Sequence, residues 1–596
     1  MTLEILLVLV ILMGTVVVLV FDLLRIDKVA LLCMLSLAWT GVLTPAEAIS
    51  GFASHAVIAM LSVMIMGHGI ARAGIMDHFA RRVVALAGDS RRRTTGILSV
   101  SAGFMSAIIQ NIGAAALLLP ALFNISRQKG IPRSQIIMPV GFAAILGGTL
   151  TMVGSGPLIL INDLLGNAGL EPYGLFAVTP VGVVLLASGI ALFLALGPRL
   201  LPSAPEGDAE PSLQERLIQG WDLPATVRFF QVTDESGIRG QTLEEAELWD
   251  RYGLNVLGLS EEGGGTFAPW RKTRFETGQR VALLGGAEEI TAFAEDACLR
   301  KVEAGPELRR LTDPSAAGFA EVMIPPRSGM AGKTLREMQL RRRFAVEPLL
   351  LIHEGERVRG DFSDMETTAG DTFVIAGLWE NIRAVRDSDD FLLVTEPEGG
   401  ERDPSKRWYA ALCFALAIAL ALGGFAISTA FLTGALAMVL TRVLDMDEAY
   451  RAVDWKVVFF LAGLIPLGTA MQNSGTAEFM AEGVMRLVEG QPVLVFLAAV
   501  AGISTLFSLF MSNVGATVIL APLLVSMSEL FGVDPRPVVL MLAVCAANSF
   551  LLPTHQVNAL YKGPGGYRNR DYLRAGGGMT ALFLVVVVGV FYLFYL

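Results

Sequence analysis

Cysteine and charge are both scarce in this sequence of 596 residues. The four cysteines lie far apart and form no Cys-x-x-Cys pair, so no disulfide framework is indicated. Charged residues make up 17% of the chain and hydrophobic residues 53%, a balance too apolar for a soluble enzyme of this length. The composition therefore predicts a membrane protein.

Motifs of the common enzyme classes are also missing. The sequence has no nucleophile elbow, no metal-ligand spacing and no phosphate loop with its lysine. No Gly-x-Gly-x-x-Gly run opens a βαβ unit, which argues against a nucleotide-binding Rossmann domain. We expect neither an enzyme nor a nucleic-acid-binding protein, and we expect no prosthetic group.

The charged residues that are present gather in one block, roughly 199–408, between two long apolar regions. This pattern predicts two membrane halves, 1–200 and 405–596, around a soluble insert that carries most of the net charge of −10. The N-terminus lacks a basic region before its apolar run, so we expect 4–22 to be a retained transmembrane helix rather than a signal peptide.

Each apolar half contains five candidate crossings and one pair of shorter, interrupted segments. A membrane helix needs about 20 residues, so the short pairs, at about 95–125 and 491–527, are predicted to be re-entrant hairpins. The other segments lie near 4–22, 28–43, 54–74, 135–165 and 174–197 in the first half and near 408–422, 424–441, 456–472, 537–562 and 576–596 in the second.

The two hairpins share a motif. Gln110-Asn111-Ile112-Gly113 begins an apolar run closed by Pro120, and Ser512-Asn513-Val514-Gly515 begins a run closed by Pro522. Both the asparagines and the prolines are 402 positions apart, which indicates duplication. A polar tip at membrane depth is tolerated where it lines a cavity, and paired interruptions point to a transporter's binding site. The alternative is that Asn-x-Gly only loosens helix packing.

Charge predicts that the halves are inverted. The first hairpin is flanked by basic residues and should open to the cytoplasm, whereas acidic residues dominate around the second, which should enter from outside. The insert then lies in the cytoplasm and both termini face outward, as in an inverted repeat in the plasma membrane. The flanking residues are Arg91, Arg92, Arg93, Arg127, Lys129 and Arg133 for the first hairpin and Glu478, Glu482, Glu489, Glu529 and Asp534, against Arg486 and Arg536, for the second.

The insert is itself duplicated, over about 205–310 and 311–400. Gly240-Gln-Thr-Leu recurs as Gly332-Lys-Thr-Leu, 92 residues on, and each copy is expected to fold as a strand, a helix beginning at the threonine, and further strands. The pair resembles RCK-C (TrkA-C) domains, the small regulatory modules appended to potassium channels and several transporters. The resemblance implies either control by a small-molecule ligand or bracing of a dimer.

Each hairpin is followed by a helix with a polar interruption, at 147–157 and at 546–558. Such interruptions free backbone carbonyls and supply hydroxyl and amide oxygens, which suit Na⁺, while helix N-termini suit an anion. One hairpin tip and one broken helix in each half would form two cation sites on either side of one anion site. The core of these segments has no carboxylate, which favours Na⁺ over H⁺ coupling.

These segments resemble the divalent anion/sodium symporter (DASS) family of the ion-transporter superfamily. The family's hairpins carry Ser-Asn-Thr motifs, and its broken helices carry Gly-Gly-Thr-x-Thr-x-x-Gly, here 147–154, and Leu-Pro-x-x-x-x-Asn, here 552–558. The resemblance implies a homodimer in which a mobile domain carries the substrate against a fixed scaffold, as an elevator.

Site residues follow from the same resemblance. It places Asn111, Gly148 and Thr149 at a first sodium site and Asn513 and Asn548 at a second, with the asparagine side chains also facing the substrate. For each serine or threonine the alternative is a hydrogen bond to a carbonyl of its own helix. His555 could donate to the anion, carry a proton or hold a backbone carbonyl. The further substrate-facing residues are Gln110, Ser512, Ser155, Thr554 and His555.

Three departures from the family motif bear on the substrate. Ile112 and Val514 replace the two threonines, and Gln110 replaces the first serine. Fewer hydroxyls favour a compact oxyanion such as sulfate, cotransported with Na⁺, over a di- or tricarboxylate, which stays an alternative. A cation/proton or arsenite-type exchanger would need membrane carboxylates, and a membrane anion sensor would bind without carrying.

Overall fold

The computed structural model comprises two compact units, one formed by Met1–Glu210 with Arg402–Leu596 and the other by Pro211–Glu401. The predicted boundaries near 200–205 and 400–405 adjoin stretches outside the described residues, and Glu489 of the predicted acidic flank itself lies outside them. The structure describes the chain except for residues 1, 22, 76–89, 203–212, 225, 262–263, 315, 327, 354, 361, 389, 396–403, 489 and 596.

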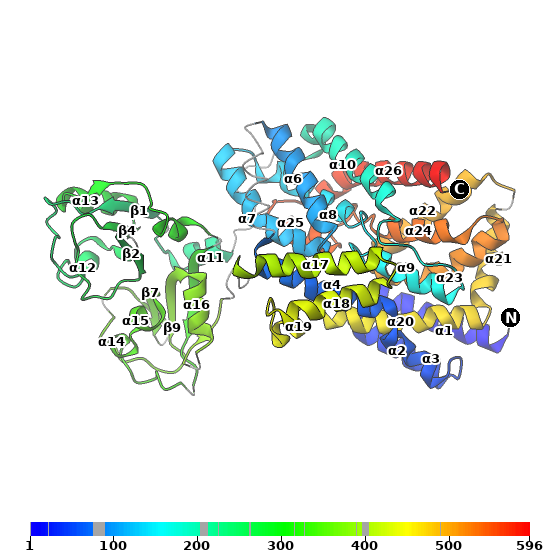
Figure 1. Cartoon of the computed structure of the whole chain (residues 1–596), viewed down its shortest axis with the longest axis horizontal. Coiled ribbons are helices and arrows are strands. Elements are labelled where there is room, and N and C mark those ends of the chain that lie inside the picture. Colours follow the sequence, from blue (N-terminus) through cyan, green and yellow to red (C-terminus); the bar gives the residue numbers. More distant parts are fainter. Residues whose placement is uncertain are drawn as a thin grey trace. The chain divides into compact units, whose positions relative to one another are not determined.

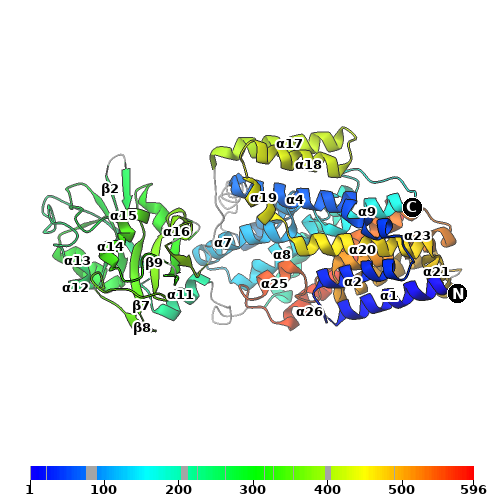
Figure 2. The same ribbon diagram turned by 90° about the horizontal axis from the view of Figure 1, so that it is seen from below.

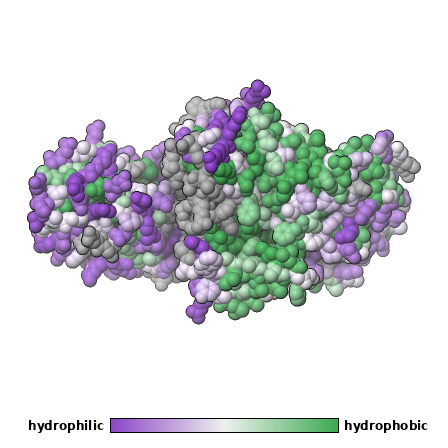
Figure 3. All heavy atoms as spheres, turned by 45° about the horizontal axis from the view of Figure 1, so that its top comes forward, coloured by the Kyte–Doolittle hydropathy of each residue, from purple (hydrophilic) through white to green (hydrophobic). Residues whose placement is uncertain are grey.

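The first unit is a helical bundle suited to a membrane. Seven of its described helical segments are long and apolar enough to cross a bilayer, and Figure 3 shows a broad hydrophobic surface over this unit with hydrophilic residues beyond it. These candidate spans are Leu3–Val20, Pro45–Arg72, Thr179–Leu200, Trp455–Asn473, Val493–Phe510, Asn513–Phe531 and Asn569–Phe594.

The two halves of this unit contain matching helices in the same order. The first half comprises α1 (Leu3–Val20), α2 (Ile26–Trp39), α3 (Pro45–Ile49), α4 (His55–Arg72), α6 (Arg91–Ser106), α7 (Asn111–Lys129), α8 (Ile137–Gly147), α9 (Gly156–Asn167) and α10 (Thr179–Leu200). The second comprises α17 (Arg407–Leu422), α18 (Ile427–Leu440), α19 (Met446–Ala452), α20 (Trp455–Asn473), α21 (Thr476–Val488), α22 (Val493–Phe510), α23 (Asn513–Phe531), α24 (Pro535–Ala546), α25 (Gln556–Lys562) and α26 (Asn569–Phe594).

The predicted hairpins are helix pairs broken at the asparagine motifs. Helices α6 and α22 begin 402 residues apart, and α7 and α23 both begin and end at that same offset. Gly130 and Gly532 terminate α7 and α23 with φ of 60° and 82°, the left-handed conformation that glycine adopts without strain. Figures 1 and 2 show α7 and α23 toward opposite ends of the helical unit.

The halves interlock at the second set of broken helices. Helix α9, which follows the break after α8, packs against α23 and α24 of the other half. In return, α25, which follows the break after α24, packs against α7 and α8. The polar breaks are thereby enclosed by helices from both halves.

The second unit contains two five-stranded antiparallel sheets of the same topology. Their strand orders are β3-β2-β4-β1-β5 and β10-β6-β9-β7-β8. Strands β1 to β5 correspond to β6 to β10, and the second order read in reverse is the same as the first. The elements are β1 (Thr226–Gln231), β2 (Asn255–Glu261), β3 (Gly264–Phe267), β4 (Arg280–Gly285), α13 (Ala287–Asp296) and β5 (Arg300–Lys301), then β6 (Ala317–Met323), β7 (Glu347–His353), β8 (Glu356–Val358), β9 (Thr372–Leu378), α16 (Trp379–Arg386) and β10 (Leu392–Leu393).

The helix expected at each repeat's threonine forms in only one of them. In the second repeat, Thr334 caps α14 (Leu335–Met338) in a capping box with Glu337, and α15 (Leu340–Phe344) follows. In the first repeat, Thr242 makes similar bonds with Glu245, but only turns follow before α12 (Leu248–Tyr252). The prediction of a helix beginning at Thr242 is therefore wrong, because this repeat forms only the capping interaction there.

Candidate functional site

The first hairpin tip is tied to the first helix break. Asn111 begins α7, and its Oδ1 accepts a hydrogen bond from Ser106 Oγ at 2.6 Å. Gly148, in the break after α8, lies so close that a Cβ added there would be 2.3 Å from Asn111 Oδ1. Thr151 Oγ1 also donates to the carbonyl of Ala107, at 2.8 Å, between the hairpin arms. Two predicted residues, Asn111 and Gly148, are thus in direct contact.

The second tip has the corresponding arrangement. Asn513 begins α23, and its Oδ1 is 2.9 Å from Ser508 Oγ and 3.1 Å from Ser549 Oγ. Ser508 Oγ is also 2.6 Å from the carbonyl oxygen of Ala546. Four oxygens with two hydroxyl protons among them are crowded together, and such a cluster suits a dehydrated monovalent cation.

Sequence reasoning missed the serines beneath the asparagines. Ser106 and Ser508 precede Asn111 and Asn513 by five residues, and they share the 402-residue offset of the two motifs. Both are fully or nearly fully buried. The signal that could have found them is this offset, extended backward into the first arm of each hairpin.

Two predicted sodium ligands use their side chains elsewhere. The Thr149 hydroxyl donates to the carbonyl of Leu146 at 2.7 Å, which is the intrahelical alternative for a buried threonine. The Asn548 amide donates to Thr505 at 3.2 Å and accepts from Thr580 at 3.1 Å, so it links α22 to α26. Ser549, the next residue, makes the contact with Asn513.

The first tip and the start of α9 meet at Met60, a buried residue of α4 that the sequence analysis did not identify. Gln110 Nε2 lies 3.1 Å from Met60 Sδ. A Cβ on Gly156, the first residue of α9, would be 3.1 Å from Met60 Cε and 2.9 Å from Val514 Cγ2. The starts of α7 and α9 therefore both lie against Met60, and the start of α23 adjoins that of α9.

The helix starts at this point have spare hydrogen-bonding capacity. Among the described residues, no side chain caps α7 or α9, whereas Ser512 caps α23 by accepting from Gly515 N at 3.4 Å. Ser155 precedes α9, and its buried Oγ has no hydrogen-bond partner in the described part of the chain. Uncapped N–H groups with the positive ends of helix dipoles favour an anion.

The remaining predicted residues lie at the break between α24 and α25. Thr554 is exposed, and His555 caps α25, its Nδ1 accepting from Val557 N at 3.2 Å. The hydrogen bond of His555 is therefore local to its own helix. Asn558, of the same predicted motif, holds the break by donating to the carbonyl of Ser549 at 2.8 Å.

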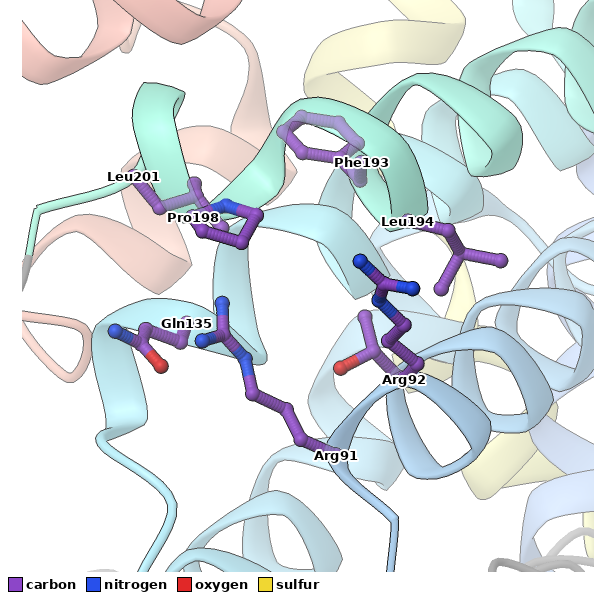
Figure 4. A pocket seen from close by; sticks show the side chains of 8 residues that line it. Arg91, Arg92, Gln135, Phe193, Leu194, Pro198 and Leu201 are labelled. Atoms are coloured by element: carbon purple, nitrogen blue, oxygen red, sulfur yellow. The ribbon is translucent and has the colours of Figure 1, made fainter.

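A separate small cavity lies away from these residues, between α6 and α10. Arg91 and Arg92 of α6 and Phe193 and Pro198 of α10 contribute to its wall, and Figure 4 shows the two arginine side chains on one side of it. None of the predicted site residues lines this cavity.

These features define a polytopic helical membrane protein whose polar helix breaks are enclosed by both halves of the chain, the architecture of a secondary transporter. The sequence profile of the CitMHS family, described as citrate transporters, matches residues 16–545. The chain belongs to this family and is a transporter rather than an enzyme.

Several proteins resemble the chain. "Uncharacterized transporter YfbS" of Escherichia coli (strain K12) is 27% identical over 95% of both chains. "Uncharacterized transporter sll0640" of Synechocystis is 28% identical over 94% of this chain and 92% of that protein. "Sodium/sulfate cotransporter 2" of Chlamydomonas reinhardtii is 22% identical over 56% of this chain and 38% of its own length. The crystal structure of the GsuK RCK domain covers 27% of this chain and 62% of that chain, with 11% identity and a TM-score of 0.14.

Proposed function

We propose that this transporter carries a divalent oxyanion, sulfate first among them, together with Na⁺. The observation that carries the proposal is the pair of uncapped helix starts at Met60, those of α7 and α9, with the start of α23 beside α9 and the hydroxyl of Ser155, which has no partner among the described residues, next to them. Backbone N–H groups and a hydroxyl are hydrogen-bond donors that suit a compact anion. The relatives named sodium/sulfate cotransporters support the same substrate and ion.

The sodium sites in this proposal are the two oxygen clusters. Asn111 with Ser106 and Gly148 forms one, and Asn513 with Ser508 and Ser549 forms the other. Binding of Na⁺ beside each tip neutralises part of the anion's charge within the bilayer, where an isolated charge is costly. That electrostatic gain is the physical basis for coupling sodium to the anion.

The movement we propose is an elevator step in a homodimer. The broken helices and hairpins would move together, because the interlocking of α9 with α23 and α24, and of α25 with α7 and α8, ties them into one body. The halves are oppositely inserted, with both termini outside and the duplicated insert, of RCK-C type, regulating transport from the cytoplasm. The insert would act by binding a ligand or by bracing the dimer.

Uptake of radiolabelled sulfate into proteoliposomes tests the substrate and the ion together. We expect accumulation with an inward sodium gradient and little when choline or potassium replaces sodium outside. Sulfate uptake independent of the sodium gradient would overturn the coupling. Counterflow exchange of labelled sulfate would show carriage and exclude a sensor that only binds.

A carboxylate substrate is the second candidate, because the family is described as citrate transporters. Competition separates the two substrates. If sulfate is the cargo, unlabelled sulfate displaces the label and excess citrate or succinate does not. Uptake of citrate or succinate that sulfate fails to inhibit would select the carboxylate.

Substituting Ser155 with alanine should weaken anion binding without harming the fold. The hydroxyl is buried and has no partner within the described residues, so its removal breaks no hydrogen bond of the protein itself. We expect the apparent affinity for sulfate to fall by roughly tenfold, the value of one lost hydrogen bond to a charged ligand. The apparent affinity for sulfate, from uptake rates, and the thermal midpoint should be measured; a changed midpoint with unchanged sulfate affinity would show that the hydroxyl is structural.

A further inference from the structure

The second unit contains a cavity of about 280 Å³ between its two repeats. Both repeats contribute equivalent positions to the wall, at residues 92 apart in the sequence. Such pairs include Leu248 with Leu340 and Asn255 with Glu347. A common apolar core, with Leu257 and Leu349 among its members, also joins the repeats, so the cavity lies within one compact unit.

The buried wall of this cavity carries polar atoms without partners. Asn255 and Glu347 are the first residues of β2 and β7 and are 9% and 1% exposed. Among the described residues, Asn255 Nδ2, Glu347 Oε2 and Arg341 Nε are buried and make no hydrogen bond. Arg341 Nη2 contacts the other carboxylate oxygen of Glu347 at 2.7 Å. One acceptor and two donors without partners among the described residues therefore belong to residues that line one cavity.

Burial of these groups is costly unless something pairs with them. A buried polar group without a hydrogen-bond partner destabilises the fold, and more so when it is charged. Burial raises the pKa of the Glu347 carboxyl, and Arg341 only partly opposes this rise. A ligand that supplies both a donor and an acceptor would satisfy all three atoms.

The charges around the cavity differ between the repeats. Glu244 and Asp250 of the first repeat are matched by Arg336 and Arg342 of the second, and each repeat also contributes the opposite charge to the wall, Arg271 in the first and Glu347 in the second. Among the described residues, no ion pair crosses the cavity: Glu244 pairs with Arg271 of its own repeat, and Arg336 with Asp364. Arg342 lies 5.8 Å from the ring centre of Trp270, which also lines the wall. The arrangement fits a ligand with one cationic and one anionic end.

We propose that this cavity binds a free α-amino acid. Its ammonium group would donate to Glu347 Oε2, and its carboxylate would accept from Arg341 Nε and Asn255 Nδ2. Trp249, Trp270 and the leucines of the wall would contact its side chain. The difference in charge between the matched positions of the two repeats disfavours a ligand with two identical halves. The proposal does not depend on which anion the membrane unit carries.

Tryptophan fluorescence of the purified full-length protein tests the proposal, because Trp249 and Trp270 line the cavity. Each standard amino acid is titrated singly, and any ligand found is compared with the amine lacking its carboxylate and the acid lacking its ammonium group. We expect a saturable change with at least one amino acid and none with either analogue. No response to any amino acid, equal binding of an analogue, or a response to ATP or a cyclic dinucleotide alone would overturn the proposal.

Substitutions in the cavity wall, compared with one elsewhere in the unit, test whether the ligand binds in this cavity. Glu347→Gln and Asn255→Ala should each weaken binding by roughly tenfold or more, since each removes a hydrogen bond to a charged ligand group. Glu356→Gln, at an exposed position of β8, is the matched control and should bind as the unchanged protein does. Thermal unfolding shows whether each variant is folded. If either folded cavity variant binds with the affinity of Glu356→Gln, the proposed site is wrong.

Discussion

Replacing Asn513 with alanine is expected to raise the sodium concentration needed for half-maximal uptake by roughly 10- to 100-fold, as loss of an ion-binding group does. Its Oδ1 belongs to the four-oxygen cluster with Ser508, Ser549 and the carbonyl of Ala546. Removing this oxygen leaves the two hydroxyls bonded only to each other and to Ala546, and the cluster loses its central acceptor. Initial rates of sulfate uptake over a sodium titration measure the effect.

The matched control is Asn473→Ala, at the exposed end of α20. This variant loses the same amide group at a position outside the oxygen clusters, so its sodium dependence should be unchanged. If Asn513→Ala transports with an unaltered sodium dependence, the second oxygen cluster is not a sodium site, whatever the substrate proves to be.

Replacing Gly148 with alanine should reduce sodium-driven uptake by roughly tenfold or more. The added Cβ would lie 2.3 Å from Asn111 Oδ1 and 3.0 Å from Asn111 Nδ2. Because Ser106 holds Asn111 by a hydrogen bond of 2.6 Å, the amide cannot move away without breaking the first oxygen cluster. The backbone at Gly148 is helical, so the strain comes from this contact alone.

Gly166→Ala provides the control for this prediction. Gly166 lies in α9, and a Cβ added there would meet no atom within 4 Å. Alanine in a helix should be neutral or stabilising by about 1 kcal/mol relative to glycine, so uptake should be retained. Both variants should be compared at equal reconstituted amounts. Full activity of Gly148→Ala would show that Asn111 and Gly148 do not act together.

Much of the membrane fold could be predicted from two features of the sequence, the hydropathy and the 402-residue offset. The offset located α7 and α23, because a duplicated motif keeps its position within its repeat. It did not reveal Met60, since that residue lies on a different helix and belongs to the site only through packing. The direction of the Asn548 side chain also depends on tertiary contacts, here with Thr505 and Thr580.

In the insert, too, the features that depend on tertiary packing could not be predicted from the sequence. Its duplication was visible as a 92-residue shift, yet the first repeat lacks the helix expected at Thr242. The cavity between the repeats could not be predicted, because it depends on which residues begin β2 and β7 and on how the two sheets pack. Asn255 and Glu347 look like ordinary polar residues in the sequence. Only their buried side-chain atoms without hydrogen-bond partners among the described residues identify them as candidate ligand-binding residues.

The most direct test of the central claim is a cryo-electron microscopy map of the protein in sodium selenate, a close analogue of sulfate. The account predicts density for the anion beside Met60, between the starts of α7, α9 and α23, with the tips of the two hairpins entering from opposite faces of the membrane. Selenate bound elsewhere, or both hairpins entering from the same face, would contradict it.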